Sequence, residues 1–128
     1  MNPTCPFCTL PAHRIVLAND LAVFIRDEFP ISPGHALIIP KRHVGSFFQI
    51  TDHEREAMLA LLIVAKKGLD DEVRPDGYNV GINDGEAAGQ TVLHLHIHLI
   101  PRYAGDMEDP RGGVRWIIPE KADYWSKR

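Results

Sequence analysis

The chain has 128 residues, a formal net charge of -3, a pI near 6.1 and 45% hydrophobic residues. This length suits one domain with one hydrophobic core. The slightly acidic balance gives no reason to expect a protein that binds nucleic acid, because such proteins usually carry a basic patch or a high pI. No signal peptide, no apolar run near the ~20 residues of a membrane helix and no disulfide framework is recognisable. We therefore expect a cytoplasmic protein that binds neither nucleic acid nor membranes.

Five runs of apolar and β-branched residues, bounded by turn residues, predict strands. They cover residues 14–18, 21–27, 35–40, 78–82 and 92–101. Asn19-Asp20 is a good hairpin turn between the first two. Most connections are too short for crossover helices, so the sheet is predicted to be antiparallel.

One long helix is predicted between the third and fourth strands. Thr51 and Glu54 fit a capping box at its start, and the helix should end before Pro75. Apolar residues recur in between at helical spacing: Met58, Leu61, Leu62, Ala65 and Leu69. Strands with one long helix indicate an α+β fold in a single domain over residues 1–128, with a core of residues 5–102 and a C-terminal tail of 103–128.

The most informative feature is the alternation of three histidines, His94, His96 and His98, within the predicted fifth strand. Side chains of a strand alternate between faces, so the three imidazoles should share one face. The apolar residues between and after them should pack on the core. An imidazole suits phosphoryl or nucleotidyl transfer, because its neutral ring nitrogen is nucleophilic near pH 7 and its protonated ring can donate to a leaving oxygen.

Two other interpretations of this row have to be weighed. A single histidine in a strand is usually structural, but burying three imidazoles without purpose is costly. A metal site is the serious rival, since His-x-His on a strand is a common way to hold zinc. The strand alone leaves nucleophile and metal ligand open.

The loop that enters this strand has the composition of a phosphate-binding segment. Gly85 and Gly89 allow a close approach of the backbone to a phosphate. Gln90 and Thr91 can donate hydrogen bonds to it.

Residues 94–100, His-Leu-His-Ile-His-Leu-Ile, resemble the signature of the histidine triad (HIT) family, His-φ-His-φ-His-φ-φ with φ apolar. The resemblance continues through residues 89–92, 33–40 and 41–43, and so spans most of residues 5–102. It implies the HIT fold, an antiparallel sheet with helices packed on one face. It also implies a homodimer whose two sheets join.

The same resemblance implies the roles of the catalytic residues. His96 would be the nucleophile. Its ring would be transiently nucleotidylated, and water would then release the mononucleotide. His98 would contact the bridging or leaving oxygen, and His94 completes the triad. His35 would support the triad from behind.

The resemblance also implies how the nucleotide would be bound. Asp27 resembles the position that binds the ribose, and Asn83 resembles a polar residue near the scissile phosphate. The phosphate would be held by side chains and backbone amides of Gly89, Gln90, Thr91 and Val92, together with His98.

The residues around the triad favour one branch of the family. Thr91 and Pro101-Arg102 resemble the Fhit-like branch, which cleaves dinucleoside polyphosphates and releases a nucleoside monophosphate. The tail 110–116 resembles that of bacterial hydrolases assigned to diadenosine polyphosphates. Arg111 and Arg115 are the better candidates there for contacting a distal phosphate, with Arg42 and Arg102 behind them. The alternative is the Hint-like branch, which hydrolyses adenosine phosphoramidates.

The pair Cys5-x-x-Cys8 has three interpretations: a redox pair, two inert thiols, or half of a zinc site. The βαβ context of a redox pair is missing. Some bacterial HIT proteins hold zinc with such a pair, a histidine after the third strand and the first triad histidine. The resemblance thus implies a closed, structural zinc site of Cys5, Cys8, His43 and His94, and no organic cofactor. His13 is a substitute ligand.

The sequence is therefore compatible with three functions. The first is a hydrolase or transferase that forms a nucleotidyl-histidine. The second is a metal-dependent hydrolase that uses the histidine row as ligands. The third is a nucleotide-binding or sensing module with slow turnover.

Overall fold

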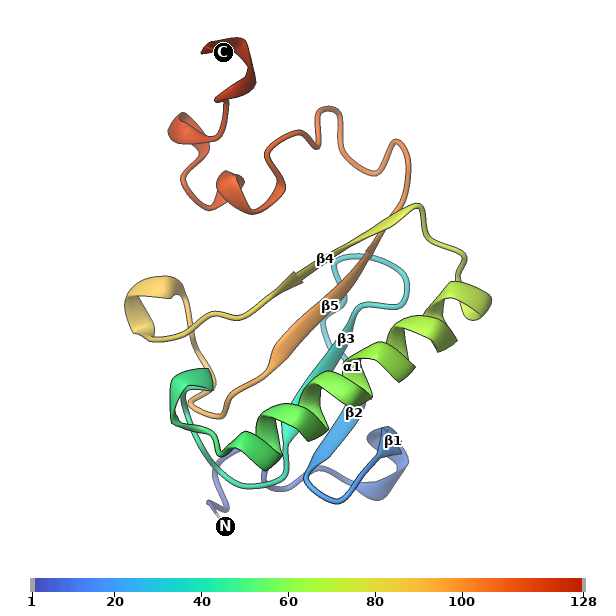
Figure 1. The fold of residues 1–128 in the computed structure, drawn as a ribbon, viewed down its shortest axis with the longest axis vertical. Helices are drawn as coiled ribbons and strands as arrows, with labels where there is room; N and C mark the ends of the chain where they lie inside the picture. The colour runs from blue at the N-terminus through green and yellow to red at the C-terminus, as the bar shows by residue number, and fades with distance from the viewer. Residues whose placement is uncertain (1, 128) are drawn as a thin grey trace.

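The computed structural model describes residues 2–127 and confirms the α+β class (Figure 1). The strands form one antiparallel sheet beside one long helix. The elements are β1 (Ile15–Ala18), β2 (Ala22–Arg26), β3 (Ala36–Pro40), α1 (Asp52–Glu72), β4 (Gly77–Gly81) and β5 (Ile97–Arg102). Among residues 2–127, no helix has both the length and the apolar character that crossing a membrane requires.

The order of the strands places β5 inside the sheet. The order is β1-β2-β3-β5-β4. After β3, α1 leads the chain to β4, which leaves one strand position open beside β3, and β5 later occupies that position. His98 of β5 is paired with Leu37 on one side and Gly81 on the other. The last histidine of the triad therefore stands on a strand that is held from both sides.

The N-terminus of α1 carries the capping box that the sequence predicts. The Thr51 hydroxyl accepts from the Glu54 amide, and the Glu54 carboxylate accepts from the Thr51 amide. The buried Glu54 carboxylate also accepts two hydrogen bonds from Arg42, at 2.9 and 2.8 Å. These bonds lower the pKa of Glu54 to about 2. Arg42 thereby ties the segment after β3 to the helix.

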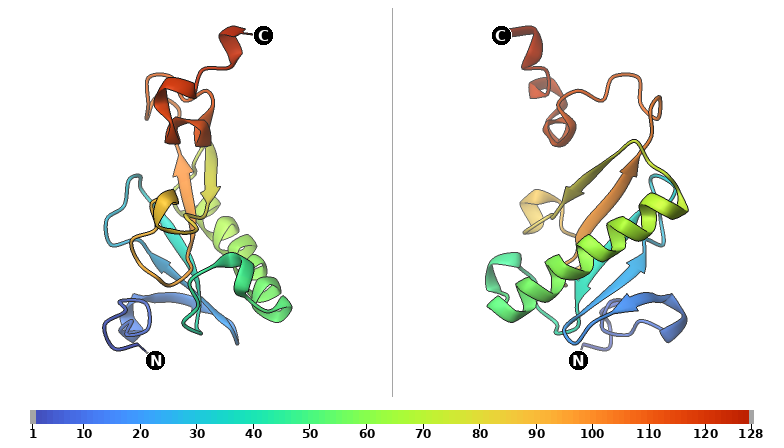
Figure 2. Two further views of the ribbon diagram at one scale, coloured as in Figure 1. Left: turned by 90° about the vertical axis from the view of Figure 1, so that its left-hand side faces the viewer. Right: turned by 45° about the vertical axis from the view of Figure 1, so that its right-hand side comes forward.

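The two faces of the sheet are covered differently. α1 packs on one face and closes the larger apolar cluster, which contains Phe24, Ile38, Met58, Leu61, Leu69, Leu95, Ile97 and Leu99 among others. On the other face, the N-terminal segment covers β2 and β3 through Phe7 and Leu10. Figure 2 shows α1 and the N-terminal segment on opposite sides. The β5 part of this second face, which carries His98, remains available for a site.

The fifth strand is shorter than the predicted 92–101, because β5 begins only at Ile97. The amide of Leu95 donates to the Val44 carbonyl at 2.7 Å and so does not join the ladder with β3. Leu95, Ile97 and Leu99 nevertheless lie in one buried cluster, so the alternation of side chains persists. His94 and His96 therefore lie on a bent segment before the strand, which corrects the prediction of a single strand face for all three histidines.

The segment after Arg102 folds largely on itself. The indole nitrogen of Trp116 donates to the Arg111 carbonyl at 2.7 Å, and the Arg111 guanidinium lies 4.7 Å from the centre of the Trp125 ring. Gly112 has a φ of 88°, and a Cβ there would lie 2.9 Å from Trp125. Figure 1 shows this tail, in orange and red, beyond the ribbon of β4 and β5.

Candidate active site and metal centre

Two cysteines and two histidines that are distant in the sequence come together at one end of the sheet. The ligand atoms of Cys5, Cys8, His43 and His94 all lie within 4.8 Å of one another. Cys5, Cys8 and His94 are buried, whereas His43 is exposed. These are the four residues that the family resemblance implies for a metal site, and the structure brings them together as a candidate metal centre.

The hydrogen bonds of His94 leave one ring nitrogen free for this centre. Its Nε2 lies 2.8 Å from the Pro40 carbonyl oxygen, which can only accept, so Nε2 carries the proton. Nδ1 then presents a lone pair toward the cysteines, 3.4 Å from Sγ of Cys5 and 3.6 Å from Sγ of Cys8. Burial lowers the pKa of His94, which keeps the ring neutral, as a metal ligand must be.

His96 is oriented by the backbone of His94. Its Nδ1 donates to the His94 carbonyl oxygen at 2.9 Å, so the neutral ring carries its lone pair on Nε2. The ring of Phe7 packs edge-on against it, with centroids 5.2 Å apart, and also against His94 at 5.9 Å. Phe7 is not among the residues predicted from the sequence, where its only signal is its place between the two cysteines.

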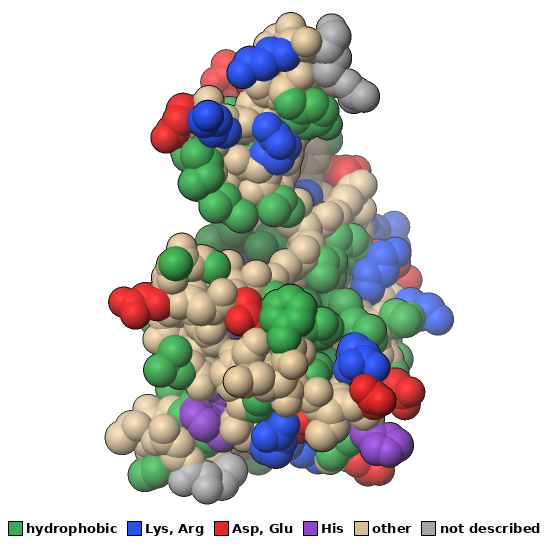
Figure 3. Space-filling view, turned by 60° about the vertical axis from the view of Figure 1, so that its left-hand side comes forward, with side chains coloured by type: hydrophobic (Ala, Val, Ile, Leu, Met, Phe, Trp, Pro, Cys, Tyr) green, Lys and Arg blue, Asp and Glu red, His purple; other side chains and the backbone are tan. Residues whose placement is uncertain are grey.

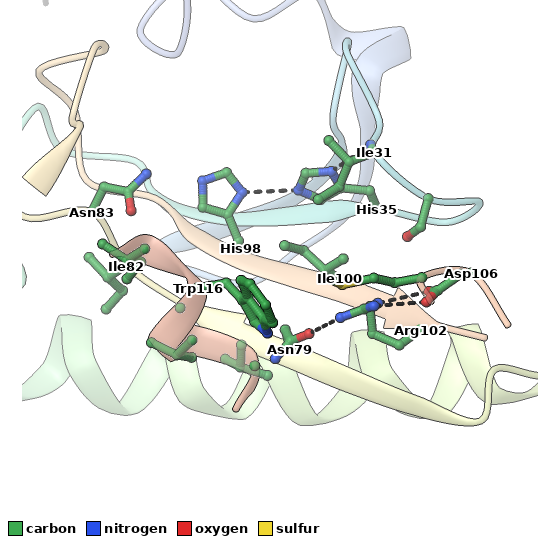
Figure 4. A pocket seen from close by; sticks show the side chains of 17 residues that line it. Ile31, His35, Asn79, Ile82, Asn83, His98, Ile100, Arg102, Asp106 and Trp116 are labelled. Carbon is green, nitrogen blue, oxygen red and sulfur yellow. Dashed lines mark hydrogen bonds and ion pairs between the residues drawn. The ribbon is translucent and has the colours of Figure 1, made fainter. Parts of the chain in front are cut away.

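A chain of hydrogen bonds determines which ring nitrogen of His98 carries the proton. The amide of Ile31 donates to Nδ1 of His35 at 3.2 Å, so Nε2 of His35 carries a proton. That Nε2 lies 3.0 Å from Nδ1 of His98, which therefore accepts. The remaining proton of His98 is on Nε2, which faces away from His35 toward the side of Asn83 (Figure 4). A backbone amide thus sets the tautomers of two histidines in succession.

Asp27 lies beside the link between His35 and His98, with Oδ2 3.4 Å from Nε2 of His35 and Oδ1 accepting from the Phe29 amide at 2.8 Å. Asp27, His35 and His98 also lie close enough together to hold a metal ion. The proton on Nε2 of His35 faces the other two groups, however, and a metal ligand needs a lone pair there. We interpret this cluster as a hydrogen-bonded relay.

Burial keeps both histidines of the relay neutral. It lowers the pKa of His98 to about 4, and nearby His96 and His35 act in the same direction while Asp27 opposes them. Burial likewise lowers the pKa of His35, again against the effect of Asp27. Neutral rings near pH 7 are what the tautomers assigned above require.

The Gln90 side chain forms its hydrogen bonds with other groups of the protein. Its carbonyl oxygen accepts from the Gly85 amide at 2.8 Å, and its amide nitrogen donates to the carbonyls of Gly45 and Val92 at 2.9 and 3.1 Å. This corrects the expectation that the Gln90 side chain holds a phosphate, because both of its amide hydrogens are used within the protein. Gln90 holds the shape of the loop.

Backbone amides of the same loop remain available to an anion. The amides of Gly89 and Gln90 donate to carbonyls of residues 85–86. Within residues 2–127, the amides of Thr91 and Val92 donate to no protein acceptor. Gly89, with a φ of 92°, is the left-handed residue that turns the chain toward them. That these two amides bind a phosphate stays a prediction of the resemblance.

The four arginines considered from the sequence are all engaged elsewhere. Arg42 binds Glu54, and Arg102 binds Asp106 through two hydrogen bonds and Asn79 through a third. Arg111 is paired with Asp109, and Arg115 donates to the carbonyls of residues 121 and 122. Arg111 and Arg115 thus bind acceptors within the tail through Nε and Nη2, and a contact of either with a distal phosphate stays a prediction.

Comparison with known proteins agrees with this geometry. Residues 11–105, which contain the sheet, the helix and all three triad histidines, match the HIT domain. The chain belongs to the HIT family. The HIT fold expected from the sequence is confirmed by solved HIT-family structures, such as one from Bacillus subtilis with a TM-score of 0.74, 31% identity and coverage of 80% of this chain and 76% of that one.

Several relatives cover most of the HIT domain. An uncharacterised HIT-like protein of Saccharolobus solfataricus is 36% identical over 80% of this chain and 76% of its own length. An AP-4-A phosphorylase of Mycobacterium tuberculosis is 33% identical over 82% of this chain, which spans only 57% of that enzyme. A Zn-bound histidine triad family protein from Mycobacterium smegmatis has a TM-score of 0.71 and 31% identity, with 98% of both chains covered.

The low pKa of His98 makes the stability of this HIT domain depend on pH. An unfolded chain binds a proton at His98 below pH 6.5, whereas the folded chain does so only near pH 4. This contribution to stability is complete above pH 6.5 and is lost as the pH falls toward 4. Between pH 7 and pH 5 it should lower the free energy of unfolding by up to about 2 kcal/mol.

Denaturant unfolding of the wild type and of His98→Asn at both pH values measures this effect. An asparagine side chain cannot titrate, so the variant should lose less stability than the wild type over the same interval. Taking the difference between the two proteins cancels the contribution of the candidate metal centre. An identical loss in both would contradict the buried, neutral state of His98.

Proposed function

We propose that this chain hydrolyses a nucleotide derivative through a covalent nucleotidyl-His96 intermediate and releases a nucleoside monophosphate. The observation that carries the proposal is the hydrogen bond from Nδ1 of His96 to the His94 carbonyl. It leaves the Nε2 lone pair as the reactive atom of a ring that cannot rotate freely. A nucleophile of this kind needs no metal ion or organic cofactor to be activated.

In the first step, Nε2 of His96 donates its electron pair to the α-phosphorus. The bond from phosphorus to the leaving atom breaks, and its electron pair goes to that atom. The Nε2–H of His98 donates a hydrogen bond to the leaving atom, which takes its proton from water. His35 and the Ile31 amide keep this donor on the correct nitrogen of His98.

In the second step, the hydroxide left from that water attacks phosphorus and the bond from phosphorus to nitrogen breaks. The electron pair returns to Nε2 of His96, and the nucleoside monophosphate is released. One water molecule is consumed overall. The free amides of Thr91 and Val92 would stabilise the negative phosphoryl oxygens in both steps.

The nucleoside would be held through its ribose. The Asp27 carboxylate, held by the Phe29 amide and beside His35, would accept from a ribose hydroxyl. Asn83 lies beside His98 and would contact the scissile phosphate. These roles follow the resemblance, and the positions of the residues are compatible with them.

Two classes of leaving group are compatible with this chemistry. The Fhit-like pattern at Thr91 and Pro101-Arg102, together with similarity to an AP-4-A phosphorylase, favours dinucleoside polyphosphates. The engagement of Arg102, Arg111 and Arg115 elsewhere favours the second candidate, a phosphoramidate, whose leaving amine carries no phosphate charge. Both classes share the His96 chemistry.

Substitution of His96 by alanine should abolish turnover but preserve mononucleotide binding. The nucleophile acts in the chemical step, while the amides and the ribose contact supply the affinity of the ground state. We expect kcat to fall at least about a thousandfold and the Kd for AMP, measured by calorimetry, to stay within about threefold. Turnover within about tenfold of the wild type would end the assignment of His96.

We further propose that Cys5, Cys8, His43 and His94 hold one structural zinc ion. Tetrahedral zinc, with Zn–S near 2.3 Å and Zn–N near 2.0 Å, would place its ligand atoms ~3.3–3.8 Å apart. The nitrogens of His43 and His94 are 3.2 Å apart, and Sγ of Cys8 lies 3.2 Å from His43. The residues therefore fit the ion. Such a closed site stabilises the fold and leaves no position for substrate.

The double substitution Cys5→Ser with Cys8→Ser should remove this ion and lower Tm. His13→Ala is the matched control, since His13 is exposed and lies outside the cluster. Elemental analysis should find one zinc per chain in the wild type and the control, and none in the double variant. Protein purified under reducing conditions without chelators that contains no metal would refute the site.

The homodimer that the resemblance implies also stays a proposal. β4 is an outer strand of the sheet and Val80 on it is 47% exposed, so a second copy could pair along this edge. Sedimentation in solution gives the mass that tests it.

A further inference from the structure

The phosphate loop, residues 83–92, is acidic although it is proposed to bind an anion. It contains Asp84 and Glu86 and neither lysine nor arginine. A carboxylate repels a phosphate, so its charge alone would weaken the binding of a nucleotide. Asp84 is also the neighbour of Asn83, which is proposed to contact the scissile phosphate. The contacts of the Asp84 side chain show what else it does.

The Asp84 carboxylate binds the connecting segment, residues 41–51, which lies between β3 and α1. Its Oδ2 accepts from the Ser46 hydroxyl at 2.9 Å and from the Phe47 amide at 3.0 Å. Hydrogen bonds to a carboxylate are stronger than those between neutral groups. The Phe47 side chain in turn packs against the larger apolar cluster. The carboxylate therefore fastens the phosphate loop to a segment that the core holds in place.

The Gln90 side chain joins the same two segments near the other end of the loop. It donates to the Gly45 carbonyl at 2.9 Å and accepts from the Gly85 amide at 2.8 Å. The free amides of residues 91–92 follow directly after it. Asp84 and Gln90 thus hold the phosphate loop at both ends against one connecting segment. In Figure 1 the two segments lie on the left, in gold and in green.

The end of β3 and the connecting segment also hold the triad. The Pro40 and Val44 carbonyls accept from the ring of His94 and the amide of Leu95, respectively. Arg42 binds this part of the chain to the beginning of α1. The triad and the phosphate loop are therefore fixed on the same support, and the distance between them depends on the bonds that each makes to it.

We propose that Asp84 is a positioning residue: through Ser46 and Phe47 it places the phosphate-binding amides relative to the nucleophile His96. This inference rests on the proposed function and adds a residue to it. The loop uses the side chain of Asp84 as a hydrogen-bond acceptor, and the charge of that side chain acts against the phosphate. Asp84 itself touches no reacting atom.

Two substitutions separate position from charge. Asp84→Asn removes the charge but keeps an oxygen that accepts hydrogen bonds, whereas Asp84→Ala removes both. If only the charge mattered, both variants should bind AMP more tightly than the wild type. We expect Asp84→Ala to bind AMP at least about tenfold more weakly, and Asp84→Asn to bind it at least as tightly as the wild type.

Calorimetry with AMP and with adenosine measures this effect. The Kd for adenosine should stay within about twofold in both variants, because adenosine has no phosphate for the loop to bind. Unchanged or tighter binding of AMP by Asp84→Ala would overturn the inference. So would an equal loss for AMP and adenosine, or an Asp84→Asn variant as weak as Asp84→Ala.

A double-mutant cycle tests whether Asp84 acts through Ser46. Both residues lie outside the buried apolar clusters, on the side of the molecule that faces the viewer below the tail in Figure 3, so their substitution leaves the core intact. The AMP affinity of Ser46→Ala with Asp84→Ala should stay within about twofold of that of Asp84→Ala alone. Losses that multiply would contradict a shared action.

Asp123→Ala is the matched control. The Asp123 carboxylate also accepts from a serine hydroxyl and a backbone amide, both of Ser126 in the tail, at 2.7 and 3.0 Å. This variant should keep the AMP affinity and the kcat/KM of the wild type, whereas kcat/KM of Asp84→Ala for an adenosine phosphoramidate should fall at least about tenfold. The same losses in Asp123→Ala would contradict the role of Asp84.

Failure of this inference can be told apart from failure of the proposed function. If the wild type binds AMP and reacts through His96 but Asp84→Ala behaves like it, only the role of Asp84 is wrong. If the wild type does not bind AMP, or if His96→Ala still turns over, the proposed function itself is wrong.

Discussion

The hydrogen bond between Nδ1 of His96 and the carbonyl of His94 is the contact on which the proposed chemistry depends. This hydrogen bond keeps its geometry only if the backbone at His94 does not move. That backbone is held by the buried His94 ring, which donates to the Pro40 carbonyl and faces the two cysteines. The neighbouring Leu95 is anchored in the core beneath α1. The proposed nucleophile is thus positioned by the candidate metal centre and by the hydrophobic core together.

The three histidines of the triad do not all carry the proton on the same ring nitrogen. His94 and His98 carry the proton on Nε2, whereas His96 carries it on Nδ1. Each assignment follows from a backbone group: the Pro40 carbonyl, the Ile31 amide acting through His35, and the His94 carbonyl. One ring can therefore bind a metal, one can attack phosphorus and one can donate to a leaving atom, because the fold places a different backbone partner beside each.

Local pattern predicted much of this structure, and long-range bonding explains what it missed. The spacing of apolar residues and the Thr51–Glu54 capping box predicted the strands and the helix. The family resemblance predicted which four residues come together in the candidate metal centre. The alternation around the histidines could not reveal that the carbonyl of Pro40, at the end of β3, bonds to the His94 ring instead of extending the ladder. The sequence also could not show that Gln90 and the tail arginines find acceptors inside the protein, since residue type does not specify the partner.

The central claim is a covalent bond between Nε2 of His96 and the α-phosphorus. Its most direct test is rapid mixing with an adenosine phosphoramidate, a quench without acid that preserves the phosphorus–nitrogen bond, and peptide mass spectrometry. The account predicts the added mass of an adenylyl group on His96, and no adduct in His96→Ala. An adduct on His94 or His98, or turnover with no adduct on any histidine under conditions that trap one in a related enzyme, would contradict it.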